Sequence, residues 1–234
     1  MSTQTQPVRI ALATGNPHKL DELRAIFAAC GLTGVQLLGL NDIQTLVPLH
    51  EPKETGTTFD ANARIKAESY ATQLGLPALA DDSGLEIDAL DGRPGVISSH
   101  YCTDGRETGM TRPERDAANN ARVLRELADV PRQRRSARFV CVMTLAIPTP
   151  GATPRVIAST RGTFEGLIGV PPEVPKGENG FGYDPLFLVA PEFTRVSAEL
   201  PPDEKNRLSH RGHAARAMAD RIASLVRQGA LVGL

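Results

Sequence analysis

The chain has 234 residues, of which 26 are basic and 27 acidic, giving a formal net charge of −1. This length predicts one large domain or two small lobes with a substantial core, and the near-neutral charge excludes a general attraction to nucleic acid or to an anionic membrane. Residues 1–7 lack the apolar segment of a signal peptide, and no stretch approaches ~20 apolar residues, so we expect a cytoplasmic protein without a membrane span. The three cysteines form neither a zinc-binding pattern nor an even disulfide set.

The N-terminal segment predicts a strand, a turn and a helix. Val8–Ala13 is apolar, Thr14–Pro17 breaks it, and apolar residues then recur at helical spacing. Asn16 suits the N-cap and Pro17 the first helical position. Free backbone N–H groups at such a helix start attract phosphate, and Lys19 is favourable there when an anion is bound. An ordinary strand–turn–helix unit with an exposed lysine is the alternative, because neither a P-loop nor a dinucleotide-binding glycine motif is present.

A second strand at residues 35–40 precedes a predicted helix over Phe59–Leu74. Asn62 and Lys66 are four residues apart and therefore share one face of that helix. On a plain surface helix both would be solvated. If the face meets a cleft, we expect Lys66 to contact phosphate and Glu54 to help bind a metal ion.

Two adjacent carboxylates stand out in the next segment. Residues 77–80 predict a buried strand that ends at Asp81 and Asp82, followed by a turn at Ser83–Gly84 and a second strand over 85–88. Charged side chains at a strand end must be solvated, paired or bound to a cation. The pattern favours a divalent-metal site in which one carboxylate also handles a water molecule. A solvated junction between strand and turn is the alternative.

The middle of the chain predicts structural elements. A turn is predicted at 91–95. A helix follows, which begins at the capping-box residues Thr111 and Glu114 and ends near Ala128. A following basic cluster has no interleaved aromatic residues, so we expect a solvated turn rather than a nucleic-acid site. This cluster consists of Arg132, Arg134, Arg135 and Arg138.

Two further strands are predicted, over Phe139–Ile147 and over 154–163. The first is apolar enough to be a central strand that is covered on both faces. A proline- and glycine-rich loop at 170–180 then leads into a segment that combines glycines with aromatic residues. Phe181 in that segment can stack on a flat ligand, and the proline after Asp184 holds that residue extended. A bulged strand with aromatic core residues is the alternative.

The last helix begins after Ser209, which suits the N-cap, and places His210 and Arg211 beside backbone N–H groups that favour an anion. A partly exposed helix cap is the alternative. Basic groups in four separate segments, together with a carboxylate pair, indicate a polyphosphate site with Mg²⁺, which usually bridges carboxylate to phosphate. The serine-nucleophile elbow and the H-E-x-x-H zinc motif are absent, which favours metal-assisted phosphate chemistry over acyl transfer.

Five segments match, in order, the motifs of one known family. They are Ala13–Lys19, Glu54–Phe59, Ala80–Leu85, Gly180–Pro185 and Ser209–Gly212. On these motifs the chain resembles the inosine triphosphate pyrophosphatase family, enzymes that remove non-standard purine nucleotides. The resemblance implies an α/β fold in a single domain over residues 1–234, with a long curved mixed β-sheet flanked by helices and two lobes around a central cleft. It also implies a homodimer, one Mg²⁺ per subunit, and hydrolysis of ITP, dITP and XTP to the monophosphate and pyrophosphate.

The resemblance also assigns roles to particular residues. It makes Asp82 the proton acceptor and a metal ligand, with Glu54 as a second metal ligand. The residues that would bind the triphosphate are Thr14, Gly15, Asn16, Pro17, His18 and Lys19, with Ser83 contributing in part. The residues that would hold the nucleotide and its base are Phe181, Gly182, Tyr183, Asp184, Lys205, His210 and Arg211.

The chain departs from the family pattern at three places. Lys53 stands where the family often has an acidic residue before Glu54, His100 stands where it often has arginine, and the loop 170–179 is long and rich in proline. Two other functions therefore stay open. One is a pyrophosphatase for other modified nucleotides, and the other is a nucleotide-binding sensor without turnover.

Overall fold

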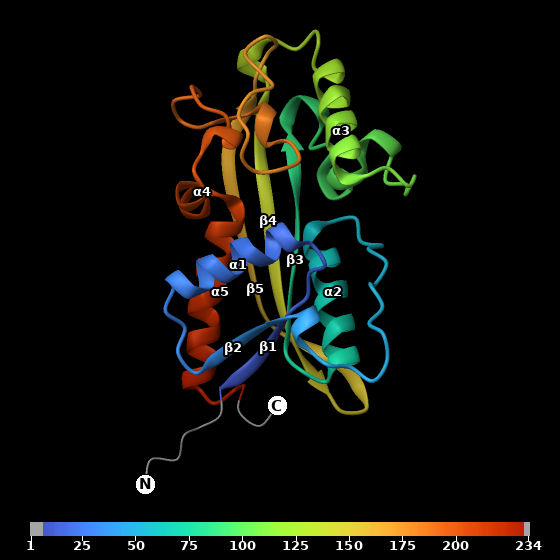
Figure 1. Ribbon diagram of the computed structural model, residues 1–234, viewed down its shortest axis with the longest axis vertical. Coiled ribbons are helices and arrows are strands. Elements are labelled where there is room, and N and C mark those ends of the chain that lie inside the picture. Colours follow the sequence, from blue (N-terminus) through green and yellow to red (C-terminus); the bar gives the residue numbers. More distant parts are fainter. Residues whose placement is uncertain (1–6, 232–234) are drawn as a thin grey trace. The chain divides into compact units, whose positions relative to one another are not determined.

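The structure, a computed structural model, describes residues 7–231 apart from the side chain of His18. The strands are β1 (Val8–Leu12), β2 (Val35–Gly39), β3 (Ala78–Ile87), β4 (Ser136–Thr149), β5 (Ala152–Ile168) and β6 (Phe187–Val189). They form a six-stranded sheet in the order β2-β1-β3-β4-β5-β6 (Figure 1). β1 pairs in parallel with β2 and β3, whereas β5 pairs antiparallel with β6. The predicted α/β fold with a mixed sheet is confirmed.

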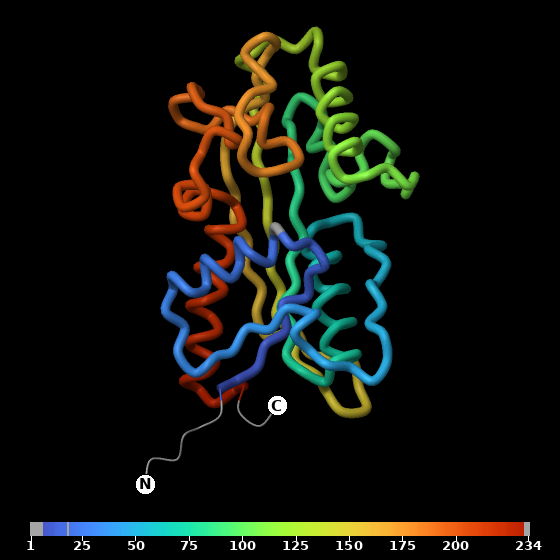
Figure 2. Tube along the Cα trace, in the orientation of Figure 1, coloured from blue at the N-terminus to red at the C-terminus, as the bar shows by residue number. Residues whose placement is uncertain are grey.

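The chain divides into two compact units. The first contains the described residues up to Asp82, Val142–Arg161 and those from Arg211 onward, and the second contains Ser83–Cys141 and Gly162–His210. Strands β3, β4 and β5 each begin in one unit and end in the other. Figure 2 shows the course of the chain, coloured by residue number. The single domain with a central cleft stays a prediction.

In the first unit, a core of small side chains brings α2 (Phe59–Leu74) against the sheet. Thr58 caps this helix by accepting a hydrogen bond from the backbone N–H of Ala61, and Gly75 ends it in the left-handed conformation at φ 60°. Alanines of α2 pack against alanines of β1, β3 and β4. Because alanine side chains are short, they allow the helix backbone to approach the sheet closely. The unit also contains α1 (Pro17–Ala29) and nearly all of α5 (His210–Arg227), both at their predicted positions.

One prediction for β3 is wrong. No turn interrupts the chain at Ser83–Gly84, and β3 runs unbroken through both aspartates. Asp81 and Asp82 are only 4% and 6% exposed, so they are buried within the strand rather than solvated at its end. The physical reason is that basic side chains of other elements pair with both carboxylates. The carboxylates therefore do not have to reach water, and the strand can continue through them.

The second unit has an aromatic and aliphatic core. The rings of Phe139 and Phe164 lie 4.6 and 5.4 Å from the ring of Phe187, centroid to centroid. Helix α3 (Arg112–Glu126) begins as predicted, with the backbone N–H of Thr111 donating to Glu114 at 2.8 Å. The unit also contains α4 (Pro202–Leu208) and a run of 3-10 turns over Gly95–Thr103. Residues 170–180 form the predicted loop.

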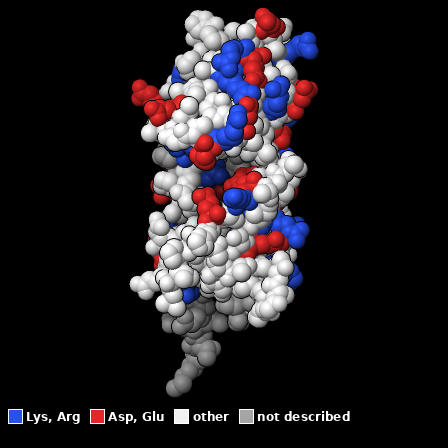
Figure 3. Space-filling model, turned by 90° about the vertical axis from the view of Figure 1, so that its right-hand side faces the viewer, with Lys and Arg blue, Asp and Glu red and all other residues white. Residues whose placement is uncertain are grey.

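Within the described range 7–231, no helix has the length and apolar character that crossing a membrane requires. On the face that Figure 3 shows, acidic and basic side chains are interspersed and neither sign dominates, in agreement with the net charge of −1.

The predicted solvated turn of arginines is wrong for half of its members. Arg138 lies on β4, and Arg135 is 2% exposed. The Arg135 guanidinium donates to the backbone carbonyls of Leu127, Val130 and Gly169 at 2.6, 2.9 and 3.0 Å. The carbonyl of Leu127 also accepts from the backbone N–H of Val130, so the buried arginine adds side-chain hydrogen bonds that join three parts of the second unit. Such a role depends on tertiary contacts that a local pattern of charges does not reveal.

Replacement of Arg135 by alanine should destabilise the protein strongly. The change removes the arginine donor from the carbonyls of Val130 and Gly169, at ~1–3 kcal/mol each, so we expect a loss of about 3 kcal/mol or more in the free energy of unfolding. Arg134→Ala is the matched control, since that neighbouring side chain is exposed, and it should change stability by less than about 0.5 kcal/mol. Urea denaturation of both variants measures the difference, and equal effects would contradict the structural role of Arg135.

Candidate functional site

The two buried aspartates of β3 are the centre of a charged cluster in the first unit. The ammonium group of Lys66, from α2, lies 3.2 Å from Asp82 Oδ1 and 2.8 Å from Glu54 Oε1. The ammonium group of Lys19, from α1, lies 2.9 Å from Asp81 Oδ2. Arg211, from α5, approaches the same oxygen at 3.7 Å. Four elements therefore supply cations or carboxylates to one cluster, in which each buried aspartate faces at least one basic group.

The segment that carries Glu54 is fixed to α2 by a close backbone approach. The side-chain oxygen of Asn62 accepts a hydrogen bond from the backbone N–H of Gly56 at 2.8 Å. A Cβ atom at Gly56 would lie 2.6 Å from both Asn62 Oδ1 and the Ala61 side chain, so only glycine fits there. Asn62 and Lys66 are both buried, so the face that they share is not solvated, and it sets the position of Glu54 relative to Asp82.

The predicted phosphate-binding segment joins β1 to α1. The hydroxyl of Thr14 accepts a hydrogen bond from the backbone N–H of Asn16 at 3.2 Å, and α1 begins at Pro17. No atom lies within 4 Å of the position that a Cβ would take on Gly15, and this residue is exposed. The backbone here therefore has room for a ligand close by. The side chain of His18 lies outside the described part of the chain.

Burial controls the charge of Asp82. Desolvation raises the pKa of its carboxyl from an ordinary value of 3.8 to about 6, while the cation of Lys66 acts in the opposite direction. For Lys66 itself, burial lowers the pKa, but the carboxylates of Asp82, Asp81 and Glu54 outweigh that effect and raise it above its ordinary value. Lys66 therefore stays protonated, and Asp82 exchanges its proton near pH 6.

The donor set suits a hard divalent cation that also binds phosphate. Among the described residues, no three His, Cys, Asp or Glu side chains are arranged to hold a metal ion. Mg²⁺ requires fewer, because it is commonly bound by one or two carboxylates, with waters and substrate phosphates completing the octahedron. Asp82 Oδ2 is buried and accepts no hydrogen bond from the described residues, so one carboxylate oxygen remains available for a cation. Glu54 supplies a second carboxylate beside Lys66.

A second group of predicted site residues lies in the other unit. Asp184 Oδ2 accepts hydrogen bonds from the backbone N–H of Phe181 at 2.9 Å and from the ammonium group of Lys205 at 2.6 Å. The hydroxyl of Tyr183 donates to the carbonyl of Ser98 at 2.7 Å. Tyr183, Asp184 and Lys205 are all buried, so their contacts shape the loop that carries Phe181. The ring of Phe181 lies near the basic groups of Lys205 and Arg112.

The structure thus brings the predicted residues together in two groups. Lys19, Glu54, Asp82 and Arg211 share the cluster of the first unit, and Phe181, Tyr183, Asp184 and Lys205 share the loop of the second. Ser83 and His210 belong to the second unit, where the His210 ring stacks on Phe139 at 5.1 Å. One unit boundary therefore falls between Asp82 and Ser83, and another between His210 and Arg211.

Sequence reasoning missed the partners of these residues. Glu22 of α1 pairs with Arg211, and Asp116 and Asn120 of α3 bind the backbone of Gly182. Glu22 is three residues after Lys19, and Asp116 and Asn120 are four apart, so helical spacing placed each pair on one face. The spacing alone does not identify what that face contacts. Of the departures, Lys53 is exposed, and Nε2 of His100 lies 2.8 Å from Glu107 Oε1.

Comparison with known proteins defines the class. The model of the Ham1 family matches residues 10–221, and the chain belongs to this family. It is 50% identical to the dITP/XTP pyrophosphatase of Frankia alni over 212 residues, covering 91% of this chain and 96% of that protein. It is 44% identical to the dITP/XTP pyrophosphatase of Nocardia farcinica over 218 residues, with coverages of 93% and 96%.

Solved structures agree with this assignment. A HAM1 protein from Coxiella burnetii superposes with a TM-score of 0.75 at 38% identity, over 93% of this chain and 99% of that chain. The nucleoside-triphosphatase / dITP/XTP pyrophosphatase from Mycobacterium abscessus has a TM-score of 0.65 at 39% identity, with coverages of 90% and 97%. The fold and the sequence therefore identify the same family.

The unusual titration of Asp82 can be tested directly in metal-free protein. We expect its carboxyl to titrate near pH 6, because burial disfavours the charged form. Lys66→Met should raise the pKa further, since the variant loses the cation that stabilises the carboxylate. Arg64→Met, which removes an exposed cation from the same helix, is the control and should leave it unchanged. Carbon-detected NMR of the side-chain carboxyls, assigned with Asp82→Asn, measures these values, and a midpoint near 4 in the parent would contradict the account.

Proposed function

We propose that this protein is a nucleoside triphosphate pyrophosphatase that hydrolyses the non-canonical purine nucleotides ITP, dITP and XTP to the monophosphate and pyrophosphate. Such an activity keeps these nucleotides out of DNA and RNA. The observation that carries the proposal is the buried carboxylate of Asp82 beside Lys66 and Glu54. Its Oδ2 atom accepts no hydrogen bond from the described residues, and its pKa is raised to about 6. The dITP/XTP pyrophosphatases among the relatives support the choice of substrates.

Asp82 has two roles in the proposed reaction. Asp82 and Glu54 would together hold Mg²⁺, and Asp82 accepts the proton of the attacking water. Mg²⁺, when bound, lowers the pKa of a coordinated water and offsets phosphate charge. Water adds to the α-phosphorus, the bond from that phosphorus to the bridging oxygen breaks, and pyrophosphate leaves. Lys66 keeps Asp82 and Glu54 in position. The carboxylate of Asp82, which accepts the proton, is therefore oriented before the substrate binds.

Phosphate binding is assigned to the segment from Thr14 to Lys19, with part of the contacts from Ser83. Backbone N–H groups at the start of α1 and the ammonium group of Lys19 suit anionic oxygens. Lys19 contacts Asp81 in the structure, so a bound triphosphate competes with that carboxylate for the lysine. This competition favours ligands with several negative charges over a monophosphate, which suits release of the product.

Base recognition is assigned to the loop at Phe181–Asp184, with Lys205, His210 and Arg211. Stacking on Phe181 contributes ~1–3 kcal/mol to any base and does not select among purines. Selection among purine bases depends on the group at position 6 of the purine ring. Hypoxanthine and xanthine have an oxygen acceptor there, whereas adenine has an amino donor. A backbone N–H directed at this position pairs with the first two bases and stays unpaired against adenine, which can discriminate up to ~10⁴-fold. Guanine has the same acceptor, so a separate contact must reject its 2-amino group.

The proposal includes three further properties that the resemblance supports. These are one Mg²⁺ per subunit, a homodimer, and a location in the cytoplasm. The purine nucleoside triphosphate is the expected partner, and neither nucleic acid nor a membrane is expected to bind.

A product-resolved assay tests the function. We expect rapid release of pyrophosphate from ITP, dITP and XTP with Mg²⁺, and much slower release from ATP, GTP and dTTP. Pyrophosphate and orthophosphate should be measured separately, because orthophosphate would place the cut at the terminal phosphate and contradict the mechanism. Turnover of other modified nucleotides only would favour the broader pyrophosphatase, and binding without turnover would favour the sensor, in which the exposed Lys53 replaces an acidic residue.

Asp82→Asn should lower kcat at least ~10²-fold, because losing a general base typically costs ~10²–10⁴-fold. The variant should remain folded, since Lys66 keeps its ion pair with Glu54. Asp60→Asn is the matched control, since it changes an exposed carboxyl on α2. Steady-state turnover of ITP, with circular dichroism to check folding, makes the comparison. Near-normal turnover by Asp82→Asn would remove this residue from the chemistry.

A further inference from the structure

Helix α3 presents three polar side chains to the loop that carries Phe181. Arg112, Asp116 and Asn120 follow at intervals of four residues, so they lie along one face of the helix. We call this face the α3 stripe. The guanidinium carbon of Arg112 lies 4.7 Å from the centroid of the Phe181 ring. Neither the family motifs nor the proposed mechanism uses any of these three residues.

The α3 stripe binds both backbone groups of a single glycine. The backbone N–H of Gly182 donates to Asp116 Oδ2 at 3.0 Å, and its carbonyl accepts from the side-chain amide of Asn120 at 3.0 Å. Gly182 is in the left-handed conformation at φ +64°. On the other side of Phe181, Gly180 is also left-handed at φ +82°, and a Cβ there would lie 2.2 Å from Asp184 Oδ2. Phe181 is therefore flanked by two glycines whose conformations are fixed by carboxylate and amide side chains.

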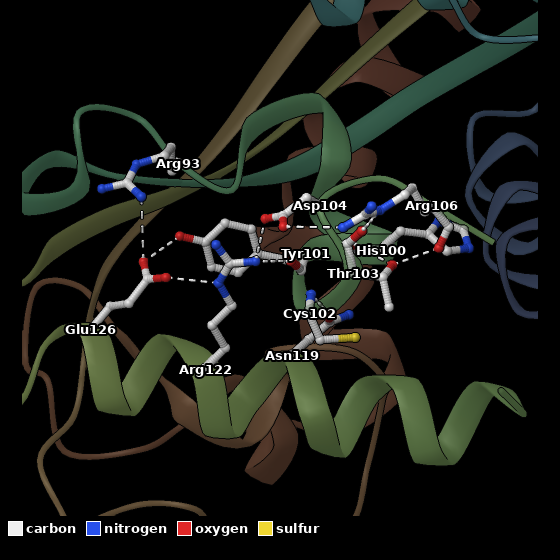
Figure 4. Close-up of polar contacts among 10 residues, drawn as sticks. All are labelled: Arg93, His100, Tyr101, Cys102, Thr103, Asp104, Arg106, Asn119, Arg122 and Glu126. Atoms are coloured by element: carbon white, nitrogen blue, oxygen red, sulfur yellow. Dashed lines mark hydrogen bonds and ion pairs between the residues drawn. The ribbon is translucent and has the colours of Figure 1, made fainter. Parts of the chain in front are cut away.

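The helix that holds the loop is itself anchored (Figure 4). Glu126 accepts hydrogen bonds from Arg122 at 2.7 Å and from the hydroxyl of Tyr101 at 2.5 Å, and Arg122 also bonds Asp104 at 2.7 Å. Asn119, next to the stripe, accepts from the backbone N–H of Cys102 at 2.7 Å. These contacts fix α3 against the segment Gly95–Thr103.

The same segment also holds the loop directly. The carbonyl of Ser98 accepts hydrogen bonds from the hydroxyl of Tyr183 at 2.7 Å and from the amide of Asn119 at 3.3 Å. Helix, segment and loop thus form a closed set of contacts within the second unit. A loop held in this way loses little conformational freedom when a ligand binds, and such preorganisation increases affinity.

We propose that α3 is the positioning element of the base-binding loop, in which Asp116 and Asn120 hold Gly182 so that the ring of Phe181 is presented to a purine base. The inference rests on the proposed function in one respect, the stacking role of Phe181. Asp116 and Asn120 do not touch the substrate. They act through the position of the ring, and therefore through binding of the base rather than through the hydrolytic step.

This mode of action has a kinetic signature. Loss of a binding contact that is equal in the ground state and the transition state raises KM and leaves kcat unchanged. Asp116→Ala should raise KM for ITP about tenfold, the size of one hydrogen bond to a charged group, with kcat within about twofold of the parent. Asp116→Asn should restore most of the affinity, because its amide oxygen still accepts from Gly182. Arg125→Ala, an exposed position on the same helix, is the control and should match the parent.

A double-mutant cycle separates positioning from general destabilisation. If Asp116 acts by placing the ring of Phe181, then Asp116→Ala should raise KM for ITP little further in a protein that already carries Phe181→Ala. A purely structural role would lower the melting temperature and add its full effect in both backgrounds. Full additivity, or an unchanged KM in Asp116→Ala, would overturn the inference.

Hydrogen exchange supplies a readout without substrate. In the parent, the amide of Gly182 should exchange slowly because Asp116 accepts its hydrogen bond, and Asp116→Ala should accelerate exchange at this amide, with little change in the core strands. Unchanged exchange would overturn the inference even if the parent hydrolysed no nucleotide. Failure of the parent to hydrolyse ITP or XTP, with accelerated exchange in the variant, would instead contradict the proposed function while leaving the loop anchor in place.

Discussion

The structure of the first unit depends on two carboxylates being buried in the middle of a strand. Asp81 and Asp82 lie within β3 at 4% and 6% exposure, where unpaired charges would be strongly unfavourable. Lysines of α1 and α2 compensate the two charges, so α1, α2 and β3 must come together for the strand to be stable. The compensation is incomplete at Asp82, whose pKa is raised to about 6. The folded state therefore holds this proton more tightly than the unfolded chain, and this carboxyl alone lowers stability as the pH rises from 3.8 to about 6.

The incomplete compensation is what the proposed chemistry requires. A carboxylate that was fully paired would be a weak base with no coordination site, whereas Asp82 keeps a buried oxygen open. Lys66 connects it to Glu54, and the close approach of Gly56 to Asn62 keeps that connection in place. Evolution of such a site trades some stability for a preorganised metal and proton acceptor. In the second unit, the loop of Phe181 follows a related principle, since polar side chains fix the backbone conformation of its glycines.

Local patterns predicted most elements because hydrophobic spacing, caps and glycine stops act within a few residues of the chain. Helix α2, for example, begins after Thr58 and ends before Gly75 as its sequence indicates. The motifs also singled out Asp82, which the fold places beside Lys66 in the charged cluster. The predictions failed where contacts with residues distant in sequence determine whether a side chain is buried. The turn at Ser83–Gly84 is absent because basic groups from other elements bury the aspartates, and Arg135 is buried because it binds carbonyls from three segments. Asp116 was not singled out, because only the fold brings it to Gly182.

In the proposed reaction, the carboxylate cluster directs water to the α-phosphorus. Hydrolysis of ITP by the Mg²⁺-loaded enzyme in ¹⁸O-enriched water, followed by mass spectrometry of both products, shows which phosphorus the water attacks. Attack at the α-phosphorus puts the label in the inosine monophosphate and leaves the pyrophosphate unlabelled. Label in the pyrophosphate would mean that water attacks the β-phosphorus, and the role assigned to Asp82 would then be wrong.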